Sequence, residues 1–420
     1  MEIIEREIFS DLKSQLDDRK VSLIIGPRQV GKTTLLKELF SLVNDDVSLF
    51  LDLDIFSNYE KVSDYKSFIN TLKLNGYKED GKKFYVFLDE FQRYDDFSMV
   101  LKNVYDHHIN IKVFASGSSS ILIKDSIQES LAGRKRLNYL YPFSFLEFLR
   151  TKDRKFLKIY NNINSISGDG LNNELNDLYE LLYEFMIFGG YPEVVLSSSS
   201  DEKIKCLESI FDLYLKKDII NYIEPSNVSI IKKLVEFLAV NNGGKLKYNN
   251  VSNRLNINYK ITKKYVEILK ESYFIFNLRP FFTNKNKEIT KTQKCYFLDT
   301  GVRNYFVNNF NELSIRNDTG ELFETFIINE FIKRGYSNLK YWEDKNQNEV
   351  DLIVDLVSRQ IPFEIKFKDR LRKSDFNSLE KFISKYADFG YLINKSEQDL
   401  NPNIKRILPF YDFGSNLFTN

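Results

Sequence analysis

The sequence predicts an α/β protein of several domains, the first of which contains a parallel sheet with helices on both faces. Over residues 1–155, short apolar runs alternate with amphipathic helical patterns, as expected for strands connected by helical crossovers. The chain has 420 residues, which is more than a single hydrophobic core usually organises. Hydrophobic residues make up 43% and charged residues 28% of the chain, a balance typical of folded, soluble proteins.

Four apolar runs in this first region are expected to be buried strands: Val21–Ile25, Val47–Leu53, Phe84–Leu88 and Ile111–Ser116. Residues 156–225 have helical patterns and are expected to form a helical extension. Residues 226–308 have the pattern of helices followed by an aromatic strand, and residues 309–420 that of a second α/β domain.

The segment after the first strand has the pattern G-x-x-x-x-G-K-[ST] and opens a helical pattern. In such a segment, glycines allow backbone N–H groups to surround phosphate oxygens at a helix N-terminus, which carries partial positive charge. Lys32 is expected to contact the β- and γ-phosphates, and Thr33 to bind Mg²⁺. The sequence therefore predicts an ATP site of the P-loop kind, with Mg²⁺ as cofactor and these nucleotide contacts: Gly26, Pro27, Arg28, Gln29, Val30, Gly31, Lys32, Thr33 and Thr34.

Two acids, Asp89 and Glu90, follow the third predicted strand. Beside a phosphate-binding loop, Asp89 is expected to hold Mg²⁺ and so to belong to the nucleotide site. Glu90 is expected to be the general base that polarises the attacking water molecule. Two solvated acids at the end of a strand are the alternative, and the neighbouring loop argues against it.

Two further positions are candidates for contact with the γ-phosphate. At the end of the fourth strand, Ser116 or Ser118 is a possible sensor, although an ordinary polar loop has the same composition. Arg134 is a candidate for stabilising transition-state charge, on this chain or on a neighbouring subunit of a homo-oligomer. The alternative for Arg134 is a solvated surface arginine.

Several segments together resemble prokaryotic ATPases of the AAA type. They are Gly26–Thr34, Leu88–Gln92, Ser116–Ser120, Ser130–Arg134, Tyr141–Phe148, Phe188–Glu193 and Phe297–Gly301. The resemblance covers nearly the whole chain. It implies an AAA-type P-loop domain over residues 1–155 and a C-terminal domain of uncertain function.

The stretch from Lys245 to Lys294 contains twelve basic and three acidic residues, a local net charge of +9. Within it, Val251–Asn258 has the pattern of a short helix and a turn, and Tyr259–Lys270 that of a second helix. An aromatic strand and a basic loop follow, and the outline resembles a winged helix-turn-helix over residues 226–308, whose second helix enters the major groove. The alternative is a small fold that packs domains together while its lysines are solvated. The predicted contacts to duplex DNA are Lys260, Lys263, Lys264, Lys285 and Lys287.

A group of charged residues near the C-terminus has the order of a metal-dependent site. Glu364 and Lys366 are two apart on a predicted strand and therefore face the same side. A neighbouring strand can bring Asp351 beside them. Two carboxylates and a lysine are suited to hold Mg²⁺ and to orient a water molecule against a phosphodiester.

With Glu324 on the preceding helix, this order resembles the PD-(D/E)XK nucleases. The resemblance implies Glu324, Asp351 and Glu364 as metal ligands, and Asp351, Glu364 and Lys366 as catalytic residues, in a restriction-endonuclease-like domain over residues 309–420. No proline precedes Asp351, which departs from the family pattern. An inactive nuclease fold used for packing or for binding DNA is the alternative.

Other residue types limit the possible chemistry. The chain has two cysteines and two histidines, and the histidines are the adjacent residues His107 and His108. These numbers exclude a disulfide framework and a zinc site built on several cysteines or histidines. They also exclude histidine-based triads in any other part of the chain. No apolar run approaches the roughly 18 residues needed to cross a bilayer. The N-terminus lacks the basic and apolar pattern of a signal peptide. A cytoplasmic protein without a membrane partner is expected.

These patterns predict an ATP-hydrolysing protein that acts on or with DNA and that contains a candidate metal-dependent nuclease site. Two alternatives stay open. One is an ATP-switched regulator that binds DNA or protein without cutting, and the other is an ATPase that remodels a protein partner.

Overall fold

The computed structural model describes residues 4–44, 47–94, 97–118, 130–162, 171–224, 227–356, 358–368, 370–395, 402–411 and 413–414. Contacts between residues divide the chain into two compact units. The second unit contains residues 144–211, 223–270 and 274–420. The first contains residues 1–143 together with 212–222 and 271–273, so two short segments from later in the chain belong to it.

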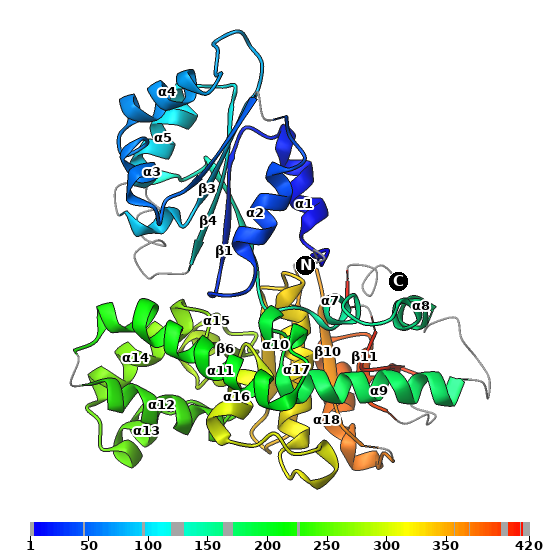
Figure 1. The fold of residues 1–420 in the computed structure, drawn as a ribbon. Coiled ribbons are helices and arrows are strands. Elements are labelled where there is room, and N and C mark those ends of the chain that lie inside the picture. Colours follow the sequence, from blue (N-terminus) through cyan, green and yellow to red (C-terminus); the bar gives the residue numbers. More distant parts are fainter. Residues whose placement is uncertain are drawn as a thin grey trace. The chain divides into compact units, whose positions relative to one another are not determined.

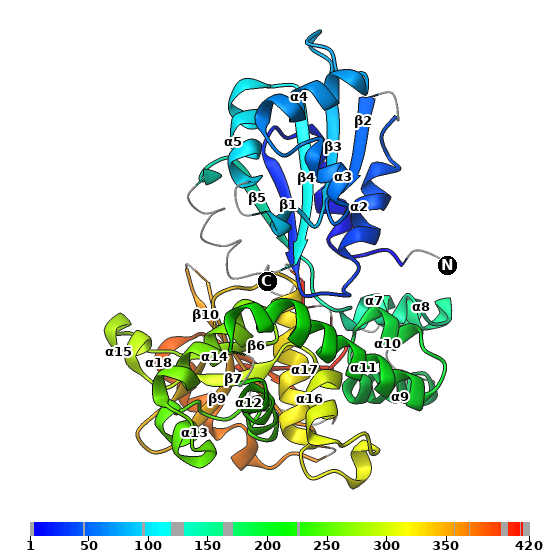
Figure 2. The ribbon, with the colours of Figure 1, turned by 60° about the vertical axis from the view of Figure 1, so that its left-hand side comes forward.

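The first unit contains a five-stranded parallel sheet in the order β2-β3-β4-β1-β5, which can be followed in Figure 2. Its apolar strands suit a parallel sheet, whose two faces are both covered. The four predicted strands are confirmed. The fifth escaped prediction because it is a charged edge strand that begins Lys135-Arg136. The bounds are β1 Val21–Gly26, β2 Ser48–Asp52, β3 Phe84–Asp89, β4 Ile111–Ser118 and β5 Lys135–Tyr139.

Helices cover both faces of this sheet. Figure 1 shows α1 and α2 on one side and α3, α4 and α5 on the other. The apolar faces of these helices and strands form one buried core, which leaves the loops at the carboxyl ends of the strands to form a site. The bounds are α1 Phe9–Ser14, α2 Lys32–Phe40, α3 Phe56–Glu60, α4 Tyr65–Leu74 and α5 Phe97–His107.

The second unit contains a seven-stranded mixed sheet in the order β12-β11-β10-β9-β8-β6-β7. β6 pairs with β8 in parallel, with Arg279 opposite Lys340 and Pro280 opposite Tyr341. The sheet therefore contains strands from both sides of residue 308, where the sequence predicts a domain boundary. The bounds are β6 Ile275–Pro280, β7 Lys294–Phe297, β8 Leu339–Glu343, β9 Glu349–Asp355, β10 Gln360–Ile365, β11 Gly390–Ile393 and β12 Ile404–Ile407.

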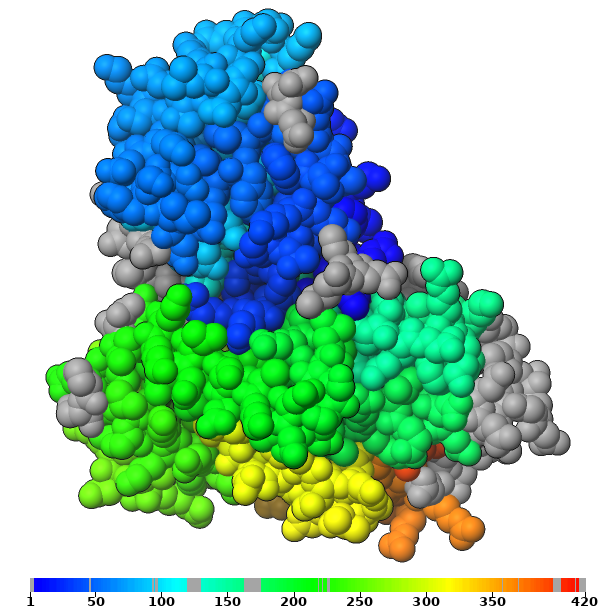
Figure 3. Space-filling model, in the orientation of Figure 1, coloured from blue at the N-terminus to red at the C-terminus, as the bar shows by residue number. Residues whose placement is uncertain are grey.

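The described residues of the predicted helical extension are mostly helical, and further helices accompany the second sheet. Helices α12 to α14, in light green, contribute to the surface in Figure 3. A π-helix, Leu215–Ile219, follows α11. The bounds are α7 Phe145–Leu149, α8 Arg154–Asn162, α9 Leu171–Phe188, α10 Pro192–Leu196, α11 Ser200–Tyr214, α12 Val228–Val240, α13 Tyr248–Leu255, α14 Tyr259–Glu271, α15 Lys285–Thr290, α16 Thr300–Val307, α17 Thr319–Lys333 and α18 Asn377–Tyr386.

Two of the motifs that carried the family resemblance pack against each other in the second unit. The buried Asp299 carboxylate accepts hydrogen bonds from the backbone N–H groups of Gly190 (2.8 Å) and Val302 (3.0 Å). A Cβ atom on Gly189 would lie 2.1 Å from Asp299 Oδ1, and one on Gly301 would lie 1.9 Å from the carbonyl oxygen of Phe188. Both glycines are therefore required by close packing, and these motifs have a structural role.

Candidate functional site

The predicted phosphate-binding loop lies between β1 and α2 at the carboxyl edge of the first sheet. Two of its residues have left-handed backbone, Gln29 (φ 60°) and Gly31 (φ 94°), and Gly31 directly precedes α2. A Cβ atom on Gly26 would lie 1.9 Å from the carbonyl oxygen of Leu140, so the first glycine is needed for the loop to pass β5. The loop thus has the tight turn and the helix N-terminus that a phosphate site requires.

Lys32 is buried, with 5% of its surface exposed. Its Nζ donates hydrogen bonds to the carbonyl oxygens of Gly26 (3.0 Å) and Pro27 (2.7 Å). Neutral carbonyl groups hold the ammonium within the loop without cancelling its charge. Phosphate oxygens carry more negative charge than carbonyl oxygens and are stronger acceptors for this lysine.

Asp89 ends β3 and Glu90 follows it, so both acids lie at the same edge of the sheet. Asp89 is buried and accepts a hydrogen bond from Ser116 Oγ on β4. Glu90 has left-handed backbone (φ 55°), which is uncommon for a residue with a side chain. Such outliers are concentrated at functional sites, where the surrounding structure holds them in place.

Strand β4 lies between β1 and β3, so the end of β4 is adjacent to both the loop and the acids. Both predicted serines at this end are buried, Ser116 at 0% and Ser118 at 1% exposure. Ser116 contacts Asp89, and Ser118 Oγ accepts a hydrogen bond of 2.7 Å from Gln92 Nε2. The structure thus gives the two serines different partners.

Gln92 was not predicted as a site residue. Its Nε2 also donates to Glu90 Oε2, at 2.5 Å, so one amide group connects Glu90 and Ser118. Its place in the Leu88–Gln92 segment, two residues after Glu90, was the sequence signal that could have identified it.

Arg6 is a second residue that sequence patterns did not single out. It is 7% exposed, and its guanidinium donates to the carbonyl oxygens of Val30 and Tyr141, each at 2.7 Å. It therefore joins the phosphate-binding loop to the segment after β5. Its position before the first strand offers no sequence signal.

Arg134 lies at the amino-terminal ends of the strands, whereas this site lies at their carboxyl ends. The next residue, Lys135, pairs with Val21 at the start of β1, whereas the loop follows the end of β1. Arg134 makes a two-pronged ion pair with Asp106, with N–O distances of 2.7 and 3.1 Å, and hydrogen bonding to Asp106 raises the pKa of Arg134. This placement separates Arg134 from the phosphates of its own chain, so a catalytic role requires a neighbouring subunit.

Residues 18–149 match the model of a family described as an AAA domain. This part of the chain is similar to AAA domains, and it contains the parallel sheet described above. Residues 179–313 and 319–413 match two families described as domains of unknown function (DUF8612 and DUF4143).

The chain is similar over most of its length to proteins without assigned roles. An uncharacterized protein of Methanocaldococcus jannaschii is 29% identical, and the match covers 96% of this chain and 90% of the relative. An uncharacterized protein of Haemophilus influenzae is 26% identical over 86% of this chain and 88% of the relative. Among solved structures, a Walker-type ATPase of Pyrococcus abyssi is 17% identical, covering 73% of this chain and 96% of that one, with a TM-score of 0.47.

The predicted helix-turn-helix region forms two helices, α13 and α14, separated by a turn in which Asn256 has left-handed backbone (φ 53°). A buried hydrogen bond of 3.0 Å joins Ser252 Oγ on α13 to Thr262 Oγ1 on α14. Three of the predicted DNA contacts are exposed on α14, and none of them makes an ion pair with another described residue: Lys260, Lys263 and Lys264.

The predicted basic loop is instead the short helix α15. The loop prediction was wrong because Asn284 acts as a helix cap, accepting hydrogen bonds from the N–H groups of Asn286 and Lys287. Lys285 and Lys287 are exposed on this helix, and Lys285 pairs with Glu288 at 3.3 Å.

The C-terminal charged residues come together on β9 and β10. Lys366 Nζ lies 3.1 Å from Asp351 Oδ2 and 2.6 Å from Glu364 Oε1. Burial works against charge on Lys366, but the two carboxylates raise its pKa. Burial and the nearby Asp351 raise the pKa of Glu364 well above its usual range. Burial therefore dominates at Glu364, whereas at Lys366 the combined effect of the two carboxyl groups outweighs burial.

The metal set predicted for this cluster is not assembled as a cage. Glu324 accepts hydrogen bonds from Tyr296 (2.5 Å) and Lys294 (3.4 Å), while Asp351 and Glu364 contact Lys366. Within the described ranges, no three His, Cys, Asp or Glu side chains lie close enough together to hold a metal ion. Glu364 Oε2 is buried and has no hydrogen-bond partner among the described residues.

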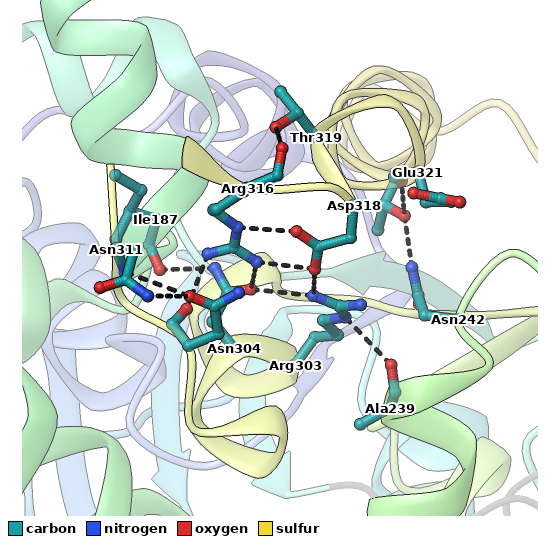
Figure 4. Close-up of polar contacts among 12 residues, drawn as sticks. Ile187, Ala239, Asn242, Arg303, Asn304, Asn311, Arg316, Asp318, Thr319 and Glu321 are labelled. Carbon is teal, nitrogen blue, oxygen red and sulfur yellow. Dashed lines mark hydrogen bonds and ion pairs between the residues drawn. The ribbon is translucent and has the colours of Figure 1, made fainter. Parts of the chain in front are cut away.

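A pocket of about 450 Å³ opens next to Glu324, and its lining includes Arg303 and Asp318, which form an ion pair. Figure 4 shows Arg303 and Arg316 directed at Asp318. Arg316 Nε lies 2.8 Å from Asp318 Oδ1, and Arg316 Nη2 lies 2.9 Å from Asp318 Oδ2. Burial opposes ionisation, but hydrogen bonds from both arginines lower the pKa of Asp318 to about 2. This network fixes the start of α17, and so the position of Glu324.

Among the helices of the described residues, none combines the length and the hydropathy that a membrane span requires.

Proposed function

We propose that this protein binds ATP at Gly26–Thr33 and hydrolyses it. The observation that carries the proposal is the convergence of a buried lysine, Lys32, and two acids, Asp89 and Glu90, at one edge of a parallel sheet beside a helix N-terminus. Lys32 donates to carbonyl oxygens of the loop, and Asp89 and Glu90 accept hydrogen bonds from the side chains of Ser116 and Gln92.

In this proposal Lys32 leaves the two carbonyl oxygens and contacts the β- and γ-phosphates. Thr33 and Asp89 supply a hydroxyl and a carboxylate, oxygen donors of the kind that Mg²⁺ prefers, and the bound ion would offset phosphate charge. A proton of the attacking water passes to Glu90 while the water oxygen bonds to the γ-phosphorus. The bond from that phosphorus to the β–γ bridging oxygen then breaks and ADP leaves.

The test is phosphate release from ATP with Mg²⁺, comparing wild type with Lys32→Ala and with Lys37→Ala as a matched control. Lys37 lies on the same helix, α2, but is exposed. We expect Lys32→Ala to lose turnover by on the order of 100-fold or more, and Lys37→Ala to retain it. Equal turnover by wild type and Lys32→Ala would overturn the proposal.

We also propose that α14 contacts the DNA backbone, because Lys260, Lys263 and Lys264 are exposed together on this helix. Affinity for duplex DNA should then fall steeply with salt concentration. Removing two phosphate contacts in Lys263→Ala/Lys264→Ala should reduce the slope of log K against log salt by about 2. The control is Lys66→Ala/Lys82→Ala, which removes two exposed lysines from the first unit. Binding that does not respond to salt would exclude this role.

A nuclease role for the cluster on β9 and β10 is supported by the contacts of Lys366 with Asp351 and Glu364 and by the buried Glu364 oxygen that has no partner among the described residues. It is tested by incubating DNA with the protein and Mg²⁺ or Mn²⁺. Cutting by wild type that is lost in Asp351→Ala/Glu364→Ala supports it. Cutting that the double variant retains would exclude it, and binding without cutting would favour an ATP-switched regulator. ATP turnover that responds to a protein but not to DNA would favour the remodelling alternative.

A further inference from the structure

Three side chains at the carboxyl edge of the first sheet form a continuous hydrogen-bonded chain. Gln92 Nε2 lies 2.5 Å from Glu90 Oε2 and 2.7 Å from Ser118 Oγ. Glu90 and Gln92 follow β3, and Ser118 ends β4, so the chain of contacts spans two neighbouring strands.

The direction of these hydrogen bonds follows from the chemistry of the groups. A carboxylate only accepts, so the amide nitrogen of Gln92 must face Glu90. An amide nitrogen has two N–H groups, and here one serves Glu90 and the other serves the oxygen of Ser118. The hydroxyl proton of Ser118 is not used in either bond and can be donated to another group.

The surrounding backbone holds Gln92 in this position. Glu90 has left-handed backbone, which sets the direction of its side chain. A Cβ atom on Gly117 would lie 2.7 Å from Gln92 Oε1 and 2.9 Å from the ring of the buried Phe91. Only glycine at position 117 lets the amide of Gln92 lie this close to β4.

We propose that Gln92 is a positioning residue that links the γ-phosphate of bound ATP to the orientation of Glu90. The inference rests on the proposed ATP hydrolysis at Gly26–Thr33. Ser118 donates its hydroxyl proton to a γ-phosphate oxygen, Gln92 donates to the oxygen of Ser118, and its second N–H holds Glu90. Gln92 itself touches neither phosphate nor water.

This arrangement makes Glu90 sensitive to the nucleotide state. With ATP bound, the serine oxygen is fixed by the phosphate, and the amide of Gln92 is fixed in turn, so Glu90 is oriented for the attacking water. With ADP, Ser118 has no γ-phosphate to donate to, and the orientation of Glu90 depends on Gln92 alone.

The test compares wild type with Gln92→Glu, which has almost the same shape but replaces the donor with an acceptor, and with Gln92→Met, which removes both donor and acceptor. Turnover, nucleotide affinity from a fluorescent ATP analogue, and the pH dependence of kcat are measured. Gln293→Glu, the same substitution at a half-buried position in the second unit, is the control.

We expect Gln92→Glu to lower kcat by about 10- to 100-fold, because misplacement of a catalytic group by about an ångström has effects of this size. Nucleotide affinity should change by less than about threefold, since Gln92 does not touch the ligand. The acidic limb of the kcat profile should move to higher pH in Gln92→Glu, because a second carboxylate beside Glu90 disfavours its ionised form. Gln92→Met should lower kcat with a smaller movement of that limb.

Unchanged kcat in both variants would overturn the inference. So would a parallel loss of affinity and kcat without movement of the acidic limb, which is the result expected of a merely structural residue. If wild type does not turn over ATP, or if Lys32→Ala is as active as wild type, the proposed function itself fails, and the two failures are thereby distinguished.

Discussion

The carboxylates at the carboxyl end of β3 and those on β9 and β10 have different neighbours. Asp89 and Glu90 receive hydrogen bonds from the neutral side chains of Ser116 and Gln92. Asp351 and Glu364 instead share the ammonium group of Lys366. A neutral donor leaves the negative charge of a carboxylate in place, whereas a lysine offsets it.

This difference indicates how easily each site can bind a cation. At the first site the two acids accept hydrogen bonds from neutral side chains, beside the loop that contains Lys32. In the second site, any cation must first compete with a lysine that both carboxylates already contact. Nucleotide chemistry is therefore the stronger proposal for this chain, and the following predictions test the contrast between the two sites.

The largest effect is expected from Glu90→Gln. Loss of the general base should lower kcat by about 10²- to 10⁴-fold while ATP still binds. Phosphate release and equilibrium binding of a fluorescent ATP analogue measure the two quantities. Turnover close to that of wild type would show that Glu90 is not the general base.

Lys366→Met should destabilise the second unit by about 3–5 kcal/mol, because it leaves buried carboxylates without their cation. Trp342, the only tryptophan of the chain, is buried on β8 beside β9, so its fluorescence during urea unfolding reports this unit. Lys368→Met is the control, since its ion pair with Asp375 is at the surface and should be worth less than about 1 kcal/mol. Equal losses in the two variants would contradict charge compensation in the cluster.

The pH dependence of stability should distinguish Glu364→Gln from wild type. Because the pKa of Glu364 is raised in the folded state, its contribution to stability is fully present below the ordinary glutamate pKa and is lost as pH rises towards the folded value. Glutamine has no proton to lose. The free energy of unfolding of Glu364→Gln should therefore increase relative to wild type between pH 5 and pH 8.

Urea unfolding followed by Trp342 fluorescence measures this difference. Glu321→Gln, at an exposed position of α17, should show no such trend. A difference between wild type and Glu364→Gln that stays constant with pH would mean that Glu364 is ionised throughout this range.

The smallest effect is expected from Ser116→Ala, which removes the neutral partner of Asp89. Loss of one buried hydrogen bond should lower the stability of the first unit by about 1–2 kcal/mol. Chemical unfolding followed by circular dichroism is the measurement, with Ser41→Ala at an exposed position as the control. A loss as large as that of Lys366→Met would remove the distinction between neutral and charged partners.

The sequence was sufficient to predict the parallel sheet and its phosphate-binding loop. These features depend on local signals, namely apolar runs and glycines at fixed spacing. Gln92 and Arg6 were missed because their roles depend on strands and loops that only the folded chain brings together. The position of Arg134 at the far edge of the sheet likewise follows from strand register, which no local pattern contains.

The sequence pattern predicted only part of the C-terminal cluster. Alternation along a strand correctly placed Glu364 and Lys366 together, and Asp351 lies beside them as expected. The pattern did not show that Lys366 would bind both acids, because ion pairing depends on side-chain geometry. It also gave no sign of β8, although that strand determines how the two predicted C-terminal domains are connected.

The pairing of β6 with β8 has a consequence for anyone who wishes to divide this protein. A chain ended at residue 308 would lack β8, so the backbone N–H and C=O groups of β6 that bond to it would be exposed. Exposed strand edges of this kind recruit strands from other molecules and promote aggregation. Insolubility of a shortened form would therefore report an unprotected edge, and fragments intended for separate study should keep β6 and β8 in the same polypeptide.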